Sequence, residues 1–382
     1  MTLNNTKPKQ KENKMDVLSL FDGMSCTQLA LKSIGVRPRK YYAAEWDKYA
    51  SSITQKNFQD TIPLGDVTKW REWDVDWSTI DLIVAGFPCQ SWSMAGARLG
   101  DRDSRGQLFW TTLDIIQHVL KANPRAKFLM ENVKMKADFE QYITHHTQQA
   151  LGVVNKHLIN SALVSAQNRQ RYYWTNIEGV EQPKDKGVVL KDILENGVTD
   201  REKSHCIDAN YFKGGNLKSY FEKHRRQLVF SPNGLCHVGD ADLNGNQSIK
   251  RVYHPEGKAP TLTTMGGGHR EPKVLVKGGR MVGRRLDANG IRKDYDKSIA
   301  LKQRIEVRED DKTNCLTTVT KDSILIEDMS WRKLTPLECE RLQTVPDGYT
   351  EGVSNTQRYK MLGNGFTVDV IAHILSNLEQ VK

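Results

Sequence analysis

The pattern of apolar positions up to residue 175 predicts strands and helices in alternation. Short apolar runs predict buried strands at residues 15–21, 40–46, 81–86 and 127–133. Apolar residues at helical spacing predict helices at residues 27–34, 47–58 and 108–120. Because short apolar strands that alternate with helices are typical of a parallel sheet covered on both faces, we expect a doubly wound α/β domain.

The pattern changes between residues 177 and 330. Glycines cluster there, charges of both signs mix, and helical periodicity fades. The segment KAPTLTT at 258–264 is echoed by KTNCLTT at 312–318. These features predict paired strands and loops in a smaller, mostly β domain.

Helical spacing returns after this region. Pro336 stands at an early position of a capped helix that begins within LTPLECERL, residues 334–342. An amphipathic helix is predicted over residues 368–378. We therefore expect one large domain that is interrupted by the smaller one and completed by the C-terminal segment.

The charge balance narrows the class of partner. Lys and Arg total 56 against 46 Asp and Glu, which gives a net charge of +10. Such an excess favours polyanions through steering and counterion release, although many soluble proteins carry it and bind nothing acidic. No stretch approaches the roughly 18 apolar residues that span a bilayer, and no apolar segment follows the lysine-rich residues 1–14. We expect no membrane partner and a loose basic tail.

The six cysteines are scattered along the chain without a CxxC pair. This spacing argues against structural zinc and against a disulfide scaffold. We expect no metal site and a reducing, cytoplasmic compartment.

Acidic residues follow the predicted strands where a parallel sheet binds ligands. A Gly-containing turn follows the first strand, and Glu45 ends the second, about twenty residues after Gly23. A carboxylate at that place suits a pair of ribose hydroxyls, and Asp66 in LGDV suits an adenine amino group. The alternative is a plain strand–turn–helix whose acids only cap helices. The Gly-x-Gly-x-x-Gly turn of nicotinamide enzymes is absent.

A cysteine lies just beyond the strand predicted at 81–86. In AGFPCQSWSMAG, Pro88 stiffens the turn and small or polar residues follow Cys89, a context that presents a thiol. Most lone cysteines at such places are inert small apolar residues. A nucleophilic role requires a nearby group that lowers the thiol pKa.

Charged groups are expected on the same rim of the sheet. Glu131 ends the strand LMENV, and Arg169 and Arg171 alternate in AQNRQRYYW, so both face one side of an extended chain. Each also has a structural alternative, in which the glutamate caps the next helix and the arginines belong to a charged edge strand. A thiol, a carboxylate and two arginines on one rim are together a specific combination.

The order FDG, EWD, GD, GFPCQ, ENV, QNRQR, a variable region, LTPLECERLQ and LGNGF resembles the C5-cytosine DNA methyltransferases of bacteria and phages. The resemblance covers residues 15–176 and 331–380. It implies a doubly wound S-adenosylmethionine-dependent sheet with an inserted recognition domain. The implied domains are a basic tail (1–14), a catalytic and cofactor domain (15–177), a target-recognition domain (178–345) and a returning segment (346–382).

The resemblance implies a role for each singled-out residue. Cys89 would add to carbon 6 of a cytosine flipped out of duplex DNA, and Glu131 would protonate or hydrogen-bond ring nitrogen 3. Arg171 resembles the arginine that holds the cytosine carbonyl, and Arg169 its partner at the base or the glutamate. Cofactor contacts are implied for Phe21, Gly23, Glu45, Trp46, Asp66, Val67, Pro88, Asn364 and Phe366.

Three rival functions require other sequence features. A transfer-RNA cytosine methyltransferase of the same architecture would carry a Cys-Phe-Thr segment, which is missing here. A nicotinamide oxidoreductase would leave GFPCQ without a role. A DNA-binding regulator with a dead enzyme core conflicts with three intact catalytic motifs. For a methyltransferase we expect a monomer in the cytoplasm of a bacterium or phage-infected host, with a cognate restriction endonuclease as a candidate partner.

Overall fold

The structure is a computed structural model, and it describes most of the chain. The described residues are 15–88, 106–215, 220, 223–230, 237–240, 251–253, 273–274, 277–287, 291–293, 295–296, 298–300, 302–307, 324–326 and 331–378. The expected basic tail at 1–14, Cys89, and the echoed segments 258–264 and 312–318 lie outside these residues.

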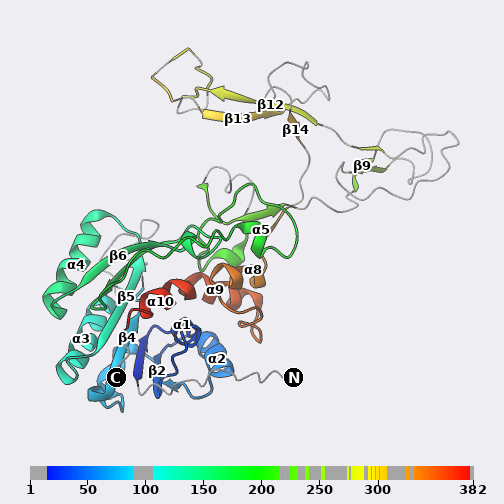
Figure 1. Cartoon of the computed structure of the whole chain (residues 1–382). Coiled ribbons are helices and arrows are strands. Elements are labelled where there is room, and N and C mark those ends of the chain that lie inside the picture. Colours follow the sequence, from blue (N-terminus) through cyan, green and yellow to red (C-terminus); the bar gives the residue numbers. More distant parts are fainter. Residues whose placement is uncertain are drawn as a thin grey trace, which may run out of the picture. The chain divides into compact units, whose positions relative to one another are not determined.

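The chain forms two compact units (Figure 1). The first comprises residues 1–195, 199–228 and 333–382, and the second comprises 196–198 and 229–332.

The first unit is an α/β sheet with its covering helices. Its strands are β1 (Asp16–Leu20), β2 (Lys40–Ala44), β3 (Ile62–Pro63), β4 (Ile80–Ala85), β5 (Lys127–Val133), β6 (Asn155–Asn160) and β7 (Gln170–Thr175). Its α-helices are α1 (Cys26–Ser33), α2 (Lys48–Asn57), α3 (Gln107–Ala122), α4 (Ala137–Leu151), α5 (Leu190–Ile193), α8 (Pro336–Leu342), α9 (Asn355–Asn364) and α10 (Val368–Leu375). Short 3₁₀ turns are η1 (Val67–Glu72), η2 (Trp77–Thr79), η4 (Ser161–Leu163) and η5 (Tyr211–Lys213). The predicted strands and helices of the first 133 residues are all present.

The sheet is mixed rather than wholly parallel. Its strand order is β3-β2-β1-β4-β5-β7-β6, and β7 runs antiparallel to both β5 and β6. Nine residues separate the end of β6 at Asn160 from the start of β7 at Gln170. A parallel crossover needs a dozen or more residues, so this connection can only reverse the chain. The expectation of a parallel sheet therefore fails at β7 and holds for β1 to β5.

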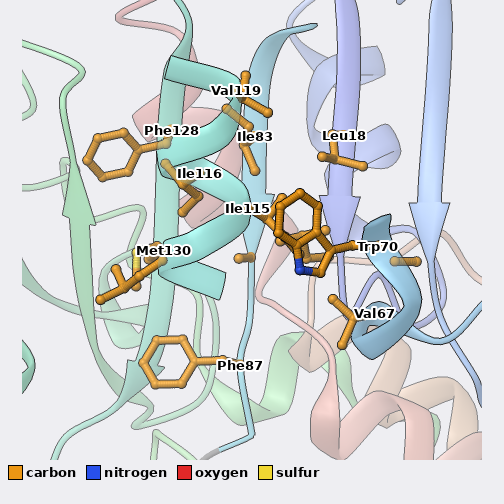
Figure 2. Packing of buried hydrophobic residues seen from close by; sticks show 14 of the residues in the cluster. Leu18, Val67, Trp70, Ile83, Phe87, Ile115, Ile116, Val119, Phe128 and Met130 are labelled. Carbon is orange, nitrogen blue, oxygen red and sulfur yellow. The ribbon is translucent and has the colours of Figure 1, made fainter. Parts of the chain in front are cut away.

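One face of the sheet packs against α3. Figure 2 shows Ile115, Ile116 and Val119 of this helix among side chains of the strands. Leu18 of β1, Ile83 of β4 and Phe128 of β5 are fully buried in the same cluster. Since successive side chains of a strand point to opposite faces, Phe128 and Met130 face α3 while Leu129 and Glu131 face the other side.

The C-terminal segment completes the first unit. In α8, Thr335 and Glu338 form a reciprocal capping box with Pro336 in the first turn, as the sequence predicts. The buried helix α10 packs against α1 (Figure 1). At the end of α9, a Cβ on Gly363 would lie 2.2 Å from the backbone of Asp208, so only glycine fits there.

The expected boundaries at residues 178 and 345 differ from the division into compact units. Residues 178–195 and 199–228 belong to the first unit because they contribute to its packing. Leu190 and Ile193 of α5 are buried, and α5 contacts α8. The backbone N–H of Glu195 also donates to Glu338 Oε1 at 2.9 Å. A four-residue helix carries too little periodicity to be recognised in the sequence.

The described part of the second unit consists of short strands. They are β9 (His237–Asp240), β10 (Arg251–Tyr253), β11 (Lys273–Val274), β12 (Lys277–Arg284), β13 (Lys302–Val307) and β14 (Ile324–Ile326), with β8 (Leu228–Phe230) and β15 (Trp331–Lys333) at the two ends of the insertion. Two three-stranded sheets form, in the orders β11-β10-β9 and β13-β12-β14. Their strand content agrees with the predicted β character. Within the described residues, no helix is both long and apolar enough to cross a bilayer.

Candidate active site

The motifs singled out in the sequence follow the carboxyl ends of neighbouring strands. The strands β1, β2, β4 and β5 lie side by side in parallel and end at Leu20, Ala44, Ala85 and Val133. Open α/β sheets bind ligands at this edge. The same edge therefore carries the turn after β1, Glu45, the segment leading to Cys89, and Glu131.

The turn after β1 is tightly wound. Phe21, Gly23 and Ser25 all have positive φ, at 57°, 61° and 61°. Asp22 holds the turn from inside, because its Oδ1 accepts from the Tyr41 hydroxyl at 2.6 Å and its Oδ2 accepts from the Ser25 hydroxyl. Burial raises the pKa of Asp22 to about 6, while these hydrogen bonds oppose the rise.

Glu45 joins this turn to the loop after β2. Its Oε2 accepts from the backbone N–H of Gly23 at 2.8 Å, and its Oε1 accepts from the N–H of Asp47 at 2.7 Å. Burial raises the pKa of Glu45, and the backbone N–H groups oppose that rise. A carboxylate has about four acceptor sites, so further donors can still be bound. Glu45 is thus fixed at the place where the sequence predicts a ribose contact.

Aromatic and acidic groups continue along this edge. The Trp46 side chain is 87% exposed although it directly follows Glu45. Asp66 follows β3 on the surface and caps η1, accepting from the N–H of Thr68 at 2.9 Å, while Val67 is buried. An exposed indole beside a fixed carboxylate fits a nucleoside, which needs a stacking surface and a hydroxyl acceptor.

The returning segment approaches the end of β4. The Phe366 ring is buried, and a Cβ on Gly86 would lie 2.8 Å from the ring atoms Cε1 and Cζ. Asn364, two residues earlier, is exposed, and Pro88 is half-buried at the last described position before Cys89. Phe366 thus reaches the loop that leads to the predicted nucleophile.

A buried ion pair lies on the neighbouring strand. The Arg171 Nε is 2.9 Å from Glu131 Oε1, and both side chains are almost completely buried. Antiparallel pairing sets Glu131 opposite Tyr173, which places Arg171, two residues before Tyr173, on the same face. Burial raises the pKa of Glu131, and the guanidinium groups of Arg171 and Arg169 oppose the rise.

Arg169 makes different contacts from Arg171. Its guanidinium is buried and donates to the carbonyl oxygens of Ile207 at 3.2 Å, Gly363 at 3.3 Å and Gly365 at 2.9 Å. These carbonyls belong to the segment after β7 and to the end of α9. Arg169 therefore ties the returning segment to the sheet, close to Glu131.

Two residues of the site have no role in the sequence-based interpretation. Buried Asn132 donates from Nδ2 to the carbonyl of Phe87 at 3.1 Å, which fixes the start of the loop that leads to Cys89. Cys206 Sγ lies 3.4 Å from Arg169 Nη1 and 3.8 Å from Arg171 Nη2. Asn132 was detectable as part of ENV, whereas nothing in the sequence connects Cys206 to the arginines.

The arrangement can hold a proton on a buried carboxyl. A carboxyl whose pKa is raised by burial takes up a proton more readily than an exposed one, and the neighbouring guanidinium orients it. A loop that begins at Gly86 and leads to a cysteine lies beside it, since a Cβ on Gly86 would be 3.8 Å from Glu131 Oε2. The Glu131 carboxyl, the Arg171 guanidinium and the start of the loop that leads to Cys89 thus lie together at one edge of the sheet.

Comparison with known proteins assigns the family. The model of the C-5 cytosine-specific DNA methylases matches residues 15–380. The orphan methyltransferase M.SPBetaI of Bacillus phage SPbeta is 29% identical, with 96% of this chain and 98% of the relative covered. The type II methyltransferase M.HhaI of Haemophilus parahaemolyticus is 28% identical over 94% of this chain and 93% of its own.

Solved structures agree with the fold. The Entamoeba histolytica methyltransferase EhMeth aligns with a TM-score of 0.54 at 13% identity, covering 96% of this chain and all of that one (100%). Spodoptera frugiperda DNMT2 aligns with a TM-score of 0.51 at 17% identity, covering 96% and 99%. The chain therefore belongs to the C-5 cytosine-specific DNA methylases, a family of S-adenosylmethionine-dependent methyltransferases.

Proposed function

We propose that this methyltransferase modifies carbon 5 of a cytosine in duplex DNA through a covalent adduct with Cys89. The observation that carries the proposal is the buried Glu131–Arg171 pair beside the loop that leads to Cys89. A stacked cytosine cannot reach this group, so the base has to be flipped out of the duplex at a cost of a few kcal/mol.

The reaction begins with addition of the thiolate to the cytosine ring. The Cys89 thiolate forms a bond to carbon 6, and the electrons of the carbon 5–carbon 6 double bond move into the ring. Glu131 delivers its proton to nitrogen 3, which keeps negative charge from building up on the base. Arg171 holds Oε1 of Glu131, so the carboxyl keeps its orientation during the transfer.

Methyl transfer and elimination complete the reaction. When bound, S-adenosylmethionine supplies the methyl group that the now electron-rich carbon 5 receives. The proton on carbon 5 then passes to a water molecule, its electron pair restores the double bond, and the bond between Cys89 and carbon 6 breaks. Nitrogen 3 returns its proton to the Glu131 carboxylate. The products are 5-methylcytosine, S-adenosylhomocysteine and the free thiolate.

The cofactor would be held by the residues that follow β1, β2 and β3. The fixed Glu45 carboxylate would accept from the ribose hydroxyls, and the exposed Trp46 ring would stack on the adenine. Asp66 and Val67 would border the adenine, and Phe21 and Gly23 would line the turn. Pro88, Asn364 and Phe366 would complete the site from the β4 loop and the returning segment. The carboxylates suit the positive charge of a sulfonium.

Duplex DNA is favoured over transfer RNA. The net charge of +10 suits a polyanion of either kind, but the long inserted region and the missing Cys-Phe-Thr segment favour DNA. A DNA substrate would place the enzyme in the cytoplasm of a bacterium or phage-infected cell. A cognate endonuclease is a further candidate partner, since one relative is named a type II methyltransferase, whereas another is named an orphan methyltransferase.

Parallel methyl-transfer assays test the substrate. The purified full chain is incubated with S-adenosylmethionine and either bacterial genomic DNA or total transfer RNA, and incorporation is measured. We expect methylated DNA. Bisulfite sequencing then locates the modified cytosines, which should share one sequence context. Incorporation into transfer RNA alone would contradict the proposal.

A further inference from the structure

Cys206 lies between the two arginines of the site. Its Sγ is 3.4 Å from Arg169 Nη1 and 3.8 Å from Arg171 Nη2. The thiol also lies 3.4 Å from the carbonyl oxygen of Ile207, the next residue. Cys26 and Cys339 are buried, and Cys206 is the half-buried one of the three cysteines among the described residues.

The two arginines serve different parts of the site. Arg171 is paired with Glu131, and Arg169 holds the carbonyls of Gly363 and Gly365 on the returning segment. Two guanidinium groups in a buried region repel each other, and an acceptor between them reduces that repulsion. The sulfur is such an acceptor, and it contacts both groups.

We propose that Cys206 is a positioning residue, whose sulfur holds Arg171 against Glu131 while Arg169 fixes the returning segment. Without this sulfur, Nη2 of Arg171 would lose one hydrogen-bond acceptor. The guanidinium would then rotate more easily, and the Glu131 carboxyl would rotate with it. The consequence for the reaction rests on the proposed function, in which Glu131 delivers the proton to the base. Burial raises the pKa of the Cys206 thiol, but the two arginines outweigh it and lower that pKa, which favours the thiolate, a stronger acceptor than the thiol.

Substitutions that keep or remove the acceptor separate this role from simple packing. Cys206→Ser keeps a small group that accepts from the arginines and donates to Ile207. Cys206→Ala removes the acceptor, and Cys206→Val removes it at a similar volume. Cys339→Ala is the matched control, because Cys339 is buried in α8 and the charged groups that act on it are Glu338, Glu340, Lys333 and Arg358 rather than Arg169 or Arg171.

Steady-state methyl transfer by the full chain tests the proposal, with thermal unfolding of each variant as the check on folding. For Cys206→Ala and Cys206→Val we expect kcat to fall about tenfold, the loss of one hydrogen bond to a charged group. KM for S-adenosylmethionine should stay within about twofold, because the contacts of Glu45 are unchanged. Cys206→Ser should recover most of kcat, and Cys339→Ala should keep it.

Two results would overturn the proposal: wild-type kcat in folded Cys206→Ala or Cys206→Val, or a Cys206→Ser variant as slow as Cys206→Ala. The activity of the wild type tests the proposed function separately from the inference about Cys206. If the wild type methylates transfer RNA and not DNA, the same variants are compared on transfer RNA. A wild type inactive on both nucleic acids would contradict the proposed function and the inference together.

Discussion

The Phe366 ring lies directly over Gly86, so close that a Cβ on Gly86 would be 2.8 Å from two ring atoms. These residues are far apart in the sequence, yet they bring the returning segment to the loop that leads from β4 to Cys89. The absence of a side chain at Gly86 is therefore required by Phe366, and the two positions should be coupled energetically.

Gly86→Ala should destabilise the protein by about 1–3 kcal/mol, because the added methyl group overpacks a contact with the buried Phe366 ring. Urea unfolding measures this loss. Phe366→Leu gives the new methyl group more room, so the double variant should be more stable than the sum of the single losses predicts. Strict additivity would contradict the contact.

Glu131→Gln should lower kcat by about 10²–10⁴-fold, the usual contribution of general acid catalysis. The amide cannot deliver a proton, but it can still accept from Arg171. The Kd for S-adenosylmethionine, measured by calorimetry, should not change. An amide variant with wild-type kcat would remove Glu131 from the proton transfer.

The pH dependence of kcat should report the same group. In the proposed reaction Glu131 acts as an acid in its protonated form, and burial raises its pKa. Activity that depends on this proton is therefore retained at lower pH and falls as the pH rises through the pKa of Glu131. The descending limb should disappear in Glu131→Gln, and a limb that persists there belongs to another group.

Glu45→Ala should weaken S-adenosylmethionine binding by about 1.5–3 kcal/mol, the value of hydrogen bonds to a charged group. Part of this loss arises because Gly23 and Asp47 lose the acceptor for their N–H groups. Binding of duplex DNA, measured by fluorescence anisotropy, should change little. Calorimetry that finds unaltered cofactor affinity would remove Glu45 from the cofactor site.

Asp22 should make stability depend on pH. Its pKa is raised to about 6 in the folded protein, so its protonated form is favoured there and ionisation opposes folding. The stability from the protonated group is complete below about pH 4 and is lost as the pH rises through about 6, by at most about 3 kcal/mol. The amide of Asp22→Asn does not ionise, so the stability of this variant relative to the wild type should increase as the pH rises through that range. A pH-independent difference between the two would contradict the assignment.

The sequence was informative wherever periodicity or a capping motif determines the local structure. The strand over Lys127–Val133 and the capped start of α8 are found where the apolar pattern and Pro336 predict them. Period-two alternation also predicts correctly that Arg169 and Arg171 lie on one side, since both reach Cys206. The positions of Glu45 and Glu131 at strand ends follow from the same pattern.

Long-range contacts could not be predicted from the sequence. That Arg169 binds the carbonyls of Gly363 and Gly365 depends on how α9 packs, and no local signal encodes it. The reversed strand β7 was missed because its apolar residues look the same in either direction. A role for Cys206 can be inferred only from the fold, which places its sulfur between two arginines.

Trapping of the covalent adduct tests the central claim most directly. A duplex in which 5-fluorocytosine replaces cytosine throughout contains the target whatever its sequence. Fluorine cannot leave carbon 5 as a proton does, so the bond between Cys89 and carbon 6 should persist after methyl transfer. With S-adenosylmethionine, we expect a complex that survives denaturation, seen as a slower band on a denaturing gel. Cys89→Ser should give none, because a hydroxyl ionises too poorly to replace the thiolate. A trapped complex that survives Cys89→Ser, or none with a wild type that methylates ordinary DNA, would contradict the mechanism.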